Sequence, residues 1–142
     1  MEITIKNITV EELKELLGIY DKPAIHDTYQ PGPYATFFDE ASVAWTKNPE
    51  SNKFYLLRQQ DYANEKLKAR GYLFLNEVYD MLGVPRTRVG QLVGWVYDVH
   101  NPVGDNYVDF GIFNKLNSNF VNGFENSILL DFNVDGNILD RL

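Results

Sequence analysis

The sequence predicts an α+β domain in which helices pack on one face of an antiparallel meander of three to five strands. Helical patterns dominate the first half of the chain, and alternating apolar and polar residues fill the last third. Between them, residues 70–98 read RGYLFLNEVYDMLGVPRTRVGQLVGWVYD, which specifies strand, helix, stop, loop and strand in succession. A chain of 142 residues with no internal repeat or linker is expected to form one domain, residues 1–142.

The first helix is predicted over residues 10–17. Thr9 and Glu12 have the spacing of a capping box, and Gly18 is a natural stop. An irregular passage follows over 19–36, where prolines rule out a regular helix. Its tyrosines and histidine either lean over a pocket or cover an edge of the core, namely Tyr20, His26, Tyr29 and Tyr34. Residues 35–38 then form a short strand or the entry to a helical turn.

Two further helices are predicted from their ends. Asn48-Pro49 resembles an N-cap followed by proline at the first helical position, and the glycine-free chain behind it predicts a long helix over 50–69 that ends at Gly71. In the central stretch, Asn76 is expected to cap a short helix over 77–82, which Gly83 closes.

Period-2 alternation predicts three strands, over 93–97, 107–113 and 127–132. The turns between them are short, which favours an antiparallel meander with one face covered by the helices. The apolar positions of the central helix and of these strands make up the predicted core: Leu75, Val78, Leu82, Trp95, Phe110, Ile112, Leu130 and Phe132.

Composition limits the function classes. The net charge of −7 argues against general nucleic-acid binding, which depends on neutralising phosphates. The absence of cysteine excludes disulfides and thiolate metal sites and fits a reducing cytoplasm. No apolar run is long enough to cross a membrane, and the first residues lack a signal-peptide pattern, so a soluble protein without a membrane partner is expected.

Charge is distributed unevenly along the chain. Residues 53–97 carry a net charge of +3, whereas the segments on either side each carry −5. Arg86 and Arg88 follow a helix stop and precede a glycine, so an exposed loop that holds a small anion is one interpretation. The candidate ligand-binding set is Arg70, Arg86 and Arg88 for phosphate, with Trp95, Tyr97 and Tyr107 to stack a base. In the alternative interpretation Trp95 is core and the arginines pair with Asp80 or Glu77.

Signals for catalysis and metal binding are weak. The chain has two histidines, His26 and His100, and no nucleophile elbow or phosphate-binding glycine loop. Residues 131–138 match the first eight positions of a calcium-binding EF-hand loop, but position twelve is Leu142 instead of glutamate. An Asp/Asn/Gly turn is the favoured interpretation of this segment, so no metal is predicted. No catalytic residue and no cofactor are predicted either. A carboxylate cluster is the only enzymatic apparatus available: Asp98, Asp105, Asp109 and Asp131.

Several segments resemble small uncharacterised proteins encoded by bacteriophages and prophages of Firmicutes. They are YLFLNEVYDMLG, VGWVYD, GDNYVDFGIF and SILLDFNVDGNILD, with YATFFDEAS, WTKNPE and QQDYAN upstream, and they cover roughly residues 34–142. The resemblance brings no catalytic residues to map. It implies a viral source and action in the cytoplasm of a bacterial host, with a role in countering host defence or in virion construction.

Two functions from different classes follow. The first is a non-enzymatic counter-defence protein that sequesters a small anionic nucleotide signal of bacterial immunity. The alternative is a virion or morphogenesis accessory that acts through protein–protein contacts, and a homo-oligomer is compatible with either. A deep pocket of arginine and aromatic residues favours the first function, and a flat apolar patch favours the second. An enzyme ranks third.

Overall fold

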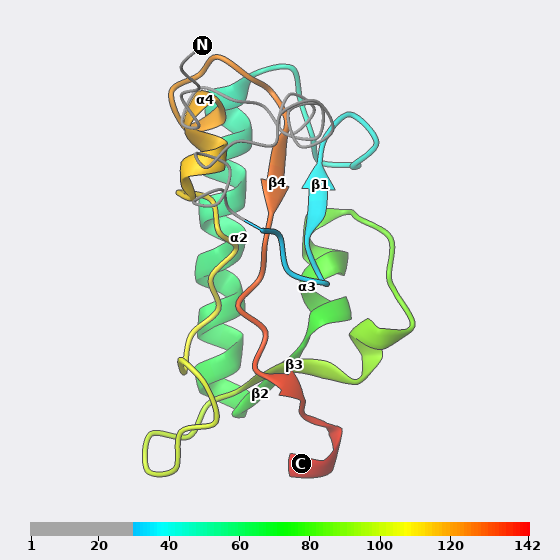
Figure 1. The fold of residues 1–142 in the computed structure, drawn as a ribbon, viewed down its shortest axis with the longest axis vertical. Helices are drawn as coiled ribbons and strands as arrows, with labels where there is room; N and C mark the ends of the chain where they lie inside the picture. Colours follow the sequence, from blue (N-terminus) through cyan, green and yellow to red (C-terminus); the bar gives the residue numbers. More distant parts are fainter. Residues whose placement is uncertain (1–29) are drawn as a thin grey trace, which may run out of the picture.

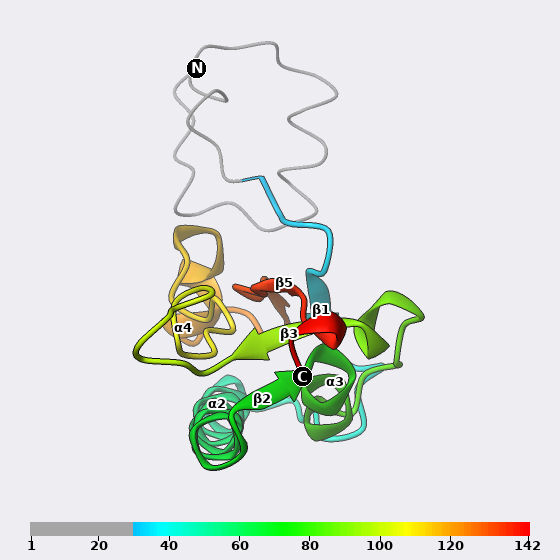
Figure 2. The same ribbon diagram turned by 90° about the horizontal axis from the view of Figure 1, so that it is seen from below.

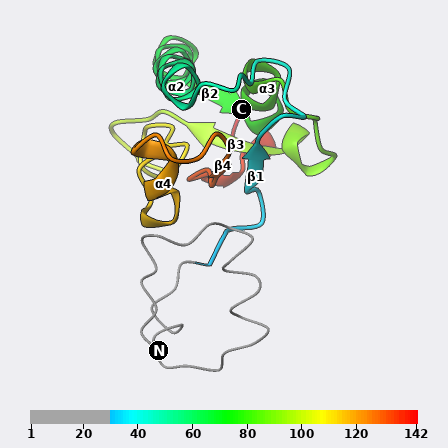
Figure 3. The same cartoon turned by 90° about the horizontal axis from the view of Figure 1, so that it is seen from above.

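The computed structural model describes residues 30–142 as an α+β fold, which confirms the predicted class. Two helices, α2 (Pro49–Arg70) and α3 (Leu75–Leu82), lie on the same side of the strands (Figures 1 and 3). The short helix α4 (Ser118–Val121) lies beside the strands, away from α3 (Figure 2). The predicted helix over 10–17 lies outside the described residues.

Within residues 30–142, five strands form two small antiparallel sheets. In the first, β1 (Thr36–Phe38) pairs with β4 (Ile128–Leu130), and Thr36 stands opposite Leu130. In the second, β3 (Val93–Val96) lies between β2 (Tyr72–Phe74) and β5 (Gly136–Asn137). Antiparallel pairing is therefore as predicted, but the strands are divided between two sheets instead of forming one continuous meander.

The ends of α2 follow the predicted local chemistry. The Asn48 side chain accepts a hydrogen bond from the Ser51 amide at 3.1 Å, and Pro49 occupies the first turn, where an amide hydrogen is not needed. At the other end Gly71 adopts φ 90°, a left-handed conformation that glycine takes without steric cost, and its amide donates to the Leu67 carbonyl.

The prediction that Asn76 caps α3 is wrong. The helix begins two residues earlier than predicted, at Leu75, and its cap position is Phe74, whose amide donates to the Glu77 carboxylate at 2.9 Å. Asn76 is buried instead, where its side chain binds both the amide and the carbonyl of Thr87 at 2.9 Å. A polar side chain at this position therefore holds the following loop against α3.

Residues 107–113 do not form the predicted strand. Side-chain amides from α2 occupy one side of this segment, where Asn64 binds both the amide and the carbonyl of Val108 and Gln60 accepts from the Phe110 amide. On the other side the Asp109 amide donates to Asn133 at 2.7 Å. The predicted alternation still holds, because Val108, Phe110 and Ile112 are all buried. β3 consequently pairs with β2 and β5 and not with this segment.

Asparagine side chains repeat one arrangement across the described residues. Each binds the amide and the carbonyl of a single distant residue, as a neighbouring β-strand would, and so satisfies backbone groups in irregular segments. The five pairs are Asn52 with Thr46, Asn64 with Val108, Asn76 with Thr87, Asn106 with Asp98 and Asn117 with Leu129.

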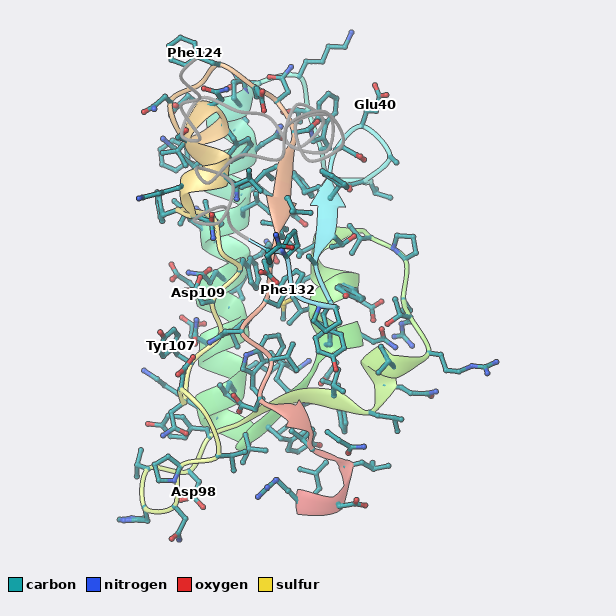
Figure 4. All side chains as sticks on the ribbon, in the orientation of Figure 1. Glu40, Asp98, Tyr107, Asp109, Phe124 and Phe132 are labelled. Carbon is teal, nitrogen blue, oxygen red and sulfur yellow. The ribbon has the colours of Figure 1, made fainter. Side chains whose placement is uncertain are left out.

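All eight predicted core residues are buried. Phe132 points into the centre of the molecule (Figure 4), and its ring contacts Tyr79 and Phe110 edge to face, with centroids 5.7 and 5.4 Å apart. Burial raises the pKa of Tyr79 to about 12, so its hydroxyl stays protonated and donates to the Tyr34 carbonyl at 2.8 Å. Tyr34 thus covers a core edge, whereas Tyr20, His26 and Tyr29 lie outside the described residues.

No helix among residues 30–142 is both long enough and apolar enough to span a membrane.

Candidate functional site

The loop that follows α3 carries Arg86 and Arg88. Arg86 forms a bidentate ion pair with Asp80, with N–O distances of 2.9 and 2.5 Å, and this hydrogen-bonded pairing lowers the pKa of Asp80 and raises that of Arg86. Arg88 is exposed and precedes a short 3₁₀ turn, Val89–Gln91. An anion at this loop would compete with Asp80 for Arg86.

Arg70 is also held by a carboxylate. Its guanidinium contacts Glu77 at 2.5 Å and lies 4.1 Å from the centre of the Tyr72 ring, while Lys66 contacts the other Glu77 oxygen at 3.2 Å. Partial burial alone would raise the pKa of Glu77, but hydrogen bonds from Arg70, the Phe74 amide and Lys66 lower it overall. Arg70 is thus paired with Glu77 and Arg86 with Asp80, as expected if these arginines have a structural role and do not bind a ligand.

The three candidate aromatic residues differ in their position relative to these arginines, and Tyr97 is the one near Arg70, since its amide donates to the Gly71 carbonyl at 2.9 Å. Trp95 has no exposed surface, and its indole donates to Asn133 at 2.9 Å, so no ring face is open to a base. Tyr97 is half-buried against the core, and Tyr107 is 49% exposed and points outward (Figure 4). The loop at 84–91 and the segment at 98–107 lie on opposite sides of the molecule (Figure 1). The structure therefore does not bring Arg86 and Arg88 together with Tyr107.

The side chains of the calcium-like loop are bound to the protein itself. Asp131 accepts from the Gly32 amide, Asn133 accepts from both Trp95 and the Asp109 amide, and Asp135 accepts from the Val96 amide. These bonds hold residues 131–135 against β3, against Asp109 and against the chain that precedes β1. Among residues 30–142 no group of three His, Cys, Asp or Glu side chains is placed to hold a metal ion.

The remaining candidate carboxylates are also hydrogen-bonded within the protein, two of them in local turns. Asp98 accepts from the amides of His100 and Asn101, which lowers its pKa, and Asp109 accepts from the Gly111 amide. Asp105 accepts from Asn133. Each of these carboxylates therefore has a structural partner in the observed fold.

A different surface stands out on α2. Its buried side packs Asn52, Leu56, Ala63 and Leu67 into the core, whereas its solvent side carries two large aromatic residues. Phe54 is 66% exposed and Tyr62 is 47% exposed, although both are costly to leave in water. We call this surface the outer face of α2, and it consists of Phe54, Leu57, Arg58, Asp61, Tyr62 and Glu65.

The outer face of α2 is shallow and open. Its six residues line a hollow of about 420 Å³, and all of them come from this one helix. A pocket that encloses a small molecule is walled by several elements, so this shape is suited to contact with another surface. Arg58, Asp61 and Glu65 form no ion pair within the described residues, which leaves their charges available to a partner.

Comparison with protein families gives one match, to a family of unknown function (DUF6353), over residues 2–142. The chain belongs to this family. The comparison with curated proteins found no match, and the comparison with solved structures found none either.

The outer face of α2 in this DUF6353 chain was not predicted from the sequence, where only the length and the ends of the helix were considered. The sequence nevertheless contains a signal for this surface, which is the position of Phe54 relative to the buried residues of the helix. Phe54 lies two positions before Leu56, about 200° away around a helix, so an aromatic residue falls on the side opposite the core. Leu57 and Tyr62 follow at helical spacing on that same side.

Proposed function

We propose that this protein is a non-enzymatic binding protein that acts by contact with another protein at the outer face of α2. The observation that carries the proposal is the exposure of Phe54 and Tyr62 on one open surface, with charges between them that form no ion pair within residues 30–142. Interface centres are enriched in aromatic residues, which bury a large area at a small entropic cost. Together with the resemblance to small phage proteins, this surface favours a virion or morphogenesis accessory.

Nucleotide sequestration remains the alternative function, and Arg86 with Arg88 is its test. If these residues hold phosphate, Arg86→Ala with Arg88→Ala weakens binding by roughly a hundredfold, since charge-assisted bonds contribute about 1.5–3 kcal/mol each. Calorimetry with cyclic nucleotides and ADP-ribose derivatives measures this. The pairing of Arg86 with Asp80 is the reason that protein contact is the preferred function, because ligand binding would have to displace a bidentate partner.

Site-specific photocrosslinking tests the preferred function. A photoreactive phenylalanine analogue replaces Phe54 in one variant and Phe113 in a second, and both are produced in bacterial cells that carry the gene. Phe113 is the matched control, because it is also 66% exposed but lies on another element. We expect a discrete covalent adduct from position 54 and none from position 113.

A further substitution shows whether the adduct depends on the surface. Tyr62→Ser removes the second aromatic residue of the outer face of α2 and should abolish the adduct at position 54. The proposal fails if position 54 gives no discrete adduct, if position 113 gives the same one, or if Tyr62→Ser leaves the yield unchanged.

A further inference from the structure

We infer that the partner at the outer face of α2 is a second copy of this chain, bound antiparallel across a two-fold axis that passes between the two helices at the level midway between Arg58 and Asp61. This inference rests on the proposed function, since it names the partner of the same surface. It also predicts which residues contact each other. The same surface on two copies of the chain is then complementary to itself.

Helical spacing makes the outer face of α2 symmetric about this axis. In an isologous contact between antiparallel helices, residue i faces residue j of the partner wherever the two numbers have the same sum. A sum of 119 places Arg58 opposite the partner's Asp61 and Leu57 opposite the partner's Tyr62. Phe54 then lies over the methylene groups of the partner's Glu65. All six residues of the surface are used, and none of these pairs brings like charges together.

Charge complementarity selects the antiparallel arrangement. The two-fold axis repeats each contact, so one interface contains two Arg58–Asp61 pairs. A parallel pairing would place Arg58 against Arg58 and Asp61 against Asp61, which is repulsive at both levels. Antiparallel pairing also brings the acidic first turn of one helix, with Glu50, toward the last turn of the other, with Lys68 and Arg70.

The same sum of 119 places Lys53 opposite the partner's Lys66, which is a pair of like charges. Each of these charges is already neutralised within its own chain. Lys53 is bound to Glu50 and to the Val121 carbonyl at 3.4 Å, and Lys66 is bound to Glu77 at 3.2 Å. Arg58 and Asp61, by contrast, take part in no side-chain hydrogen bond or ion pair within residues 30–142. The free charges are thus those that meet an opposite charge across the axis.

The size of the surface sets the expected strength. Residues 54–65 span about 16 Å of helix, at about 1.5 Å per residue. Six side chains on each copy are far fewer than the roughly 20–30 per side of a standard stable interface. We therefore expect a reversible dimer that forms at micromolar to millimolar protein concentration.

Sedimentation equilibrium with charge-reversal variants tests the inference. The wild-type mass should rise from that of the 16.4 kDa chain toward twice that value as concentration increases. Arg58→Asp and Asp61→Arg should each weaken self-association by about tenfold or more, because each creates two like-charged contacts. Arg88→Asp and Asp140→Arg are the matched controls, since they change the same charges at exposed positions outside this surface.

Mixing the two variants provides the decisive result. Arg58→Asp leaves an acid at both central positions of the surface, and Asp61→Arg leaves an arginine at both, so an equimolar mixture should dimerise more strongly than either variant alone. Circular dichroism confirms that each variant is folded.

A wild-type chain that stays monomeric up to about 1 mM overturns the inference, as does a mixture that associates no better than its components. A crosslink from position 54 to a different protein would then leave the proposed function standing while removing the dimer. Absence of any crosslink at that position would remove both.

Discussion

The bond between Asn64 and the Val108 backbone provides a direct test of how this fold satisfies its irregular segment. The Asn64 side chain accepts from the Val108 amide at 2.7 Å and donates to the Val108 carbonyl at 3.0 Å. Val108 is only 1% exposed, so water cannot replace these bonds. Asn64→Ala leaves one buried donor and one buried acceptor without partners.

The expected destabilisation follows from those two groups. A buried polar backbone group that loses its partner costs about 1–3 kcal/mol, so Asn64→Ala should lower the free energy of unfolding by about 2–6 kcal/mol. This is a large part of the roughly 5–15 kcal/mol by which a domain is stable. Asn64→Asp keeps the acceptor for the amide but places a carboxylate against the Val108 carbonyl, so it should also destabilise the fold.

Urea unfolding followed by circular dichroism measures these differences. Glu65→Ala is the matched control, because Glu65 is exposed on the same helix and its loss should change stability by less than about 0.5 kcal/mol. In hydrogen exchange, the Val108 amide should lose protection in Asn64→Ala. If Asn64→Ala is as stable as Glu65→Ala, the Asn64 side chain does not substitute for a neighbouring strand at residues 107–113.

Three further outcomes are expected. Phe110→Ala should destabilise by about 3–5 kcal/mol, because Phe110 is fully buried against Phe132, and an unchanged melting temperature would contradict this. Glu77→Gln should lower the melting temperature at neutral pH. The pKa of Glu77 is lowered in the fold, so the stability that its charge contributes is present above about pH 4.5 and is lost as the pH falls through the lowered value. The gap between wild type and Glu77→Gln should therefore close in acid, and a gap independent of pH would exclude the ion pairs as its cause. Gly94→Ala should disrupt the pairing of β2 with β3, since an added Cβ would lie 1.9 Å from the Leu73 carbonyl oxygen, and an unchanged amide exchange pattern in these strands would contradict that contact.

Local chemistry explains why the long helix could be predicted almost to the residue. Asn48, Pro49 and Gly71 act within one turn of the positions they define, so their effect does not depend on the rest of the fold. The core was predictable for a related reason. Alternating apolar residues over 107–113 turn the same side inward although this segment is not a strand, and Val108, Phe110 and Ile112 are buried accordingly.

Strand pairing was not predictable because it depends on partners distant in sequence. The strands here are two to four residues long, so their alternation contains little information about register. Asn64 and Asn117 decide which backbone groups remain free for a strand, and their partners lie 44 and 12 residues away. Asn76 shows the same limit, because an asparagine before a helical pattern is a reasonable cap by sequence and a buried loop anchor in the structure.

The candidate binding residues were harder to predict from the sequence than the helices and the core. Arg70, Arg86 and Trp95 were chosen for their chemistry, but chemistry alone does not distinguish a free guanidinium from one paired with a carboxylate six or seven residues away. An aromatic residue on the polar side of a well-delimited helix is a stronger signal, since the caps of α2 and its buried stripe together determine which side faces solvent. Phe54 meets that condition, and its position could have been recognised from sequence once the bounds of α2 were accepted. For this chain, the outer face of α2 is therefore the surface at which binding experiments should begin.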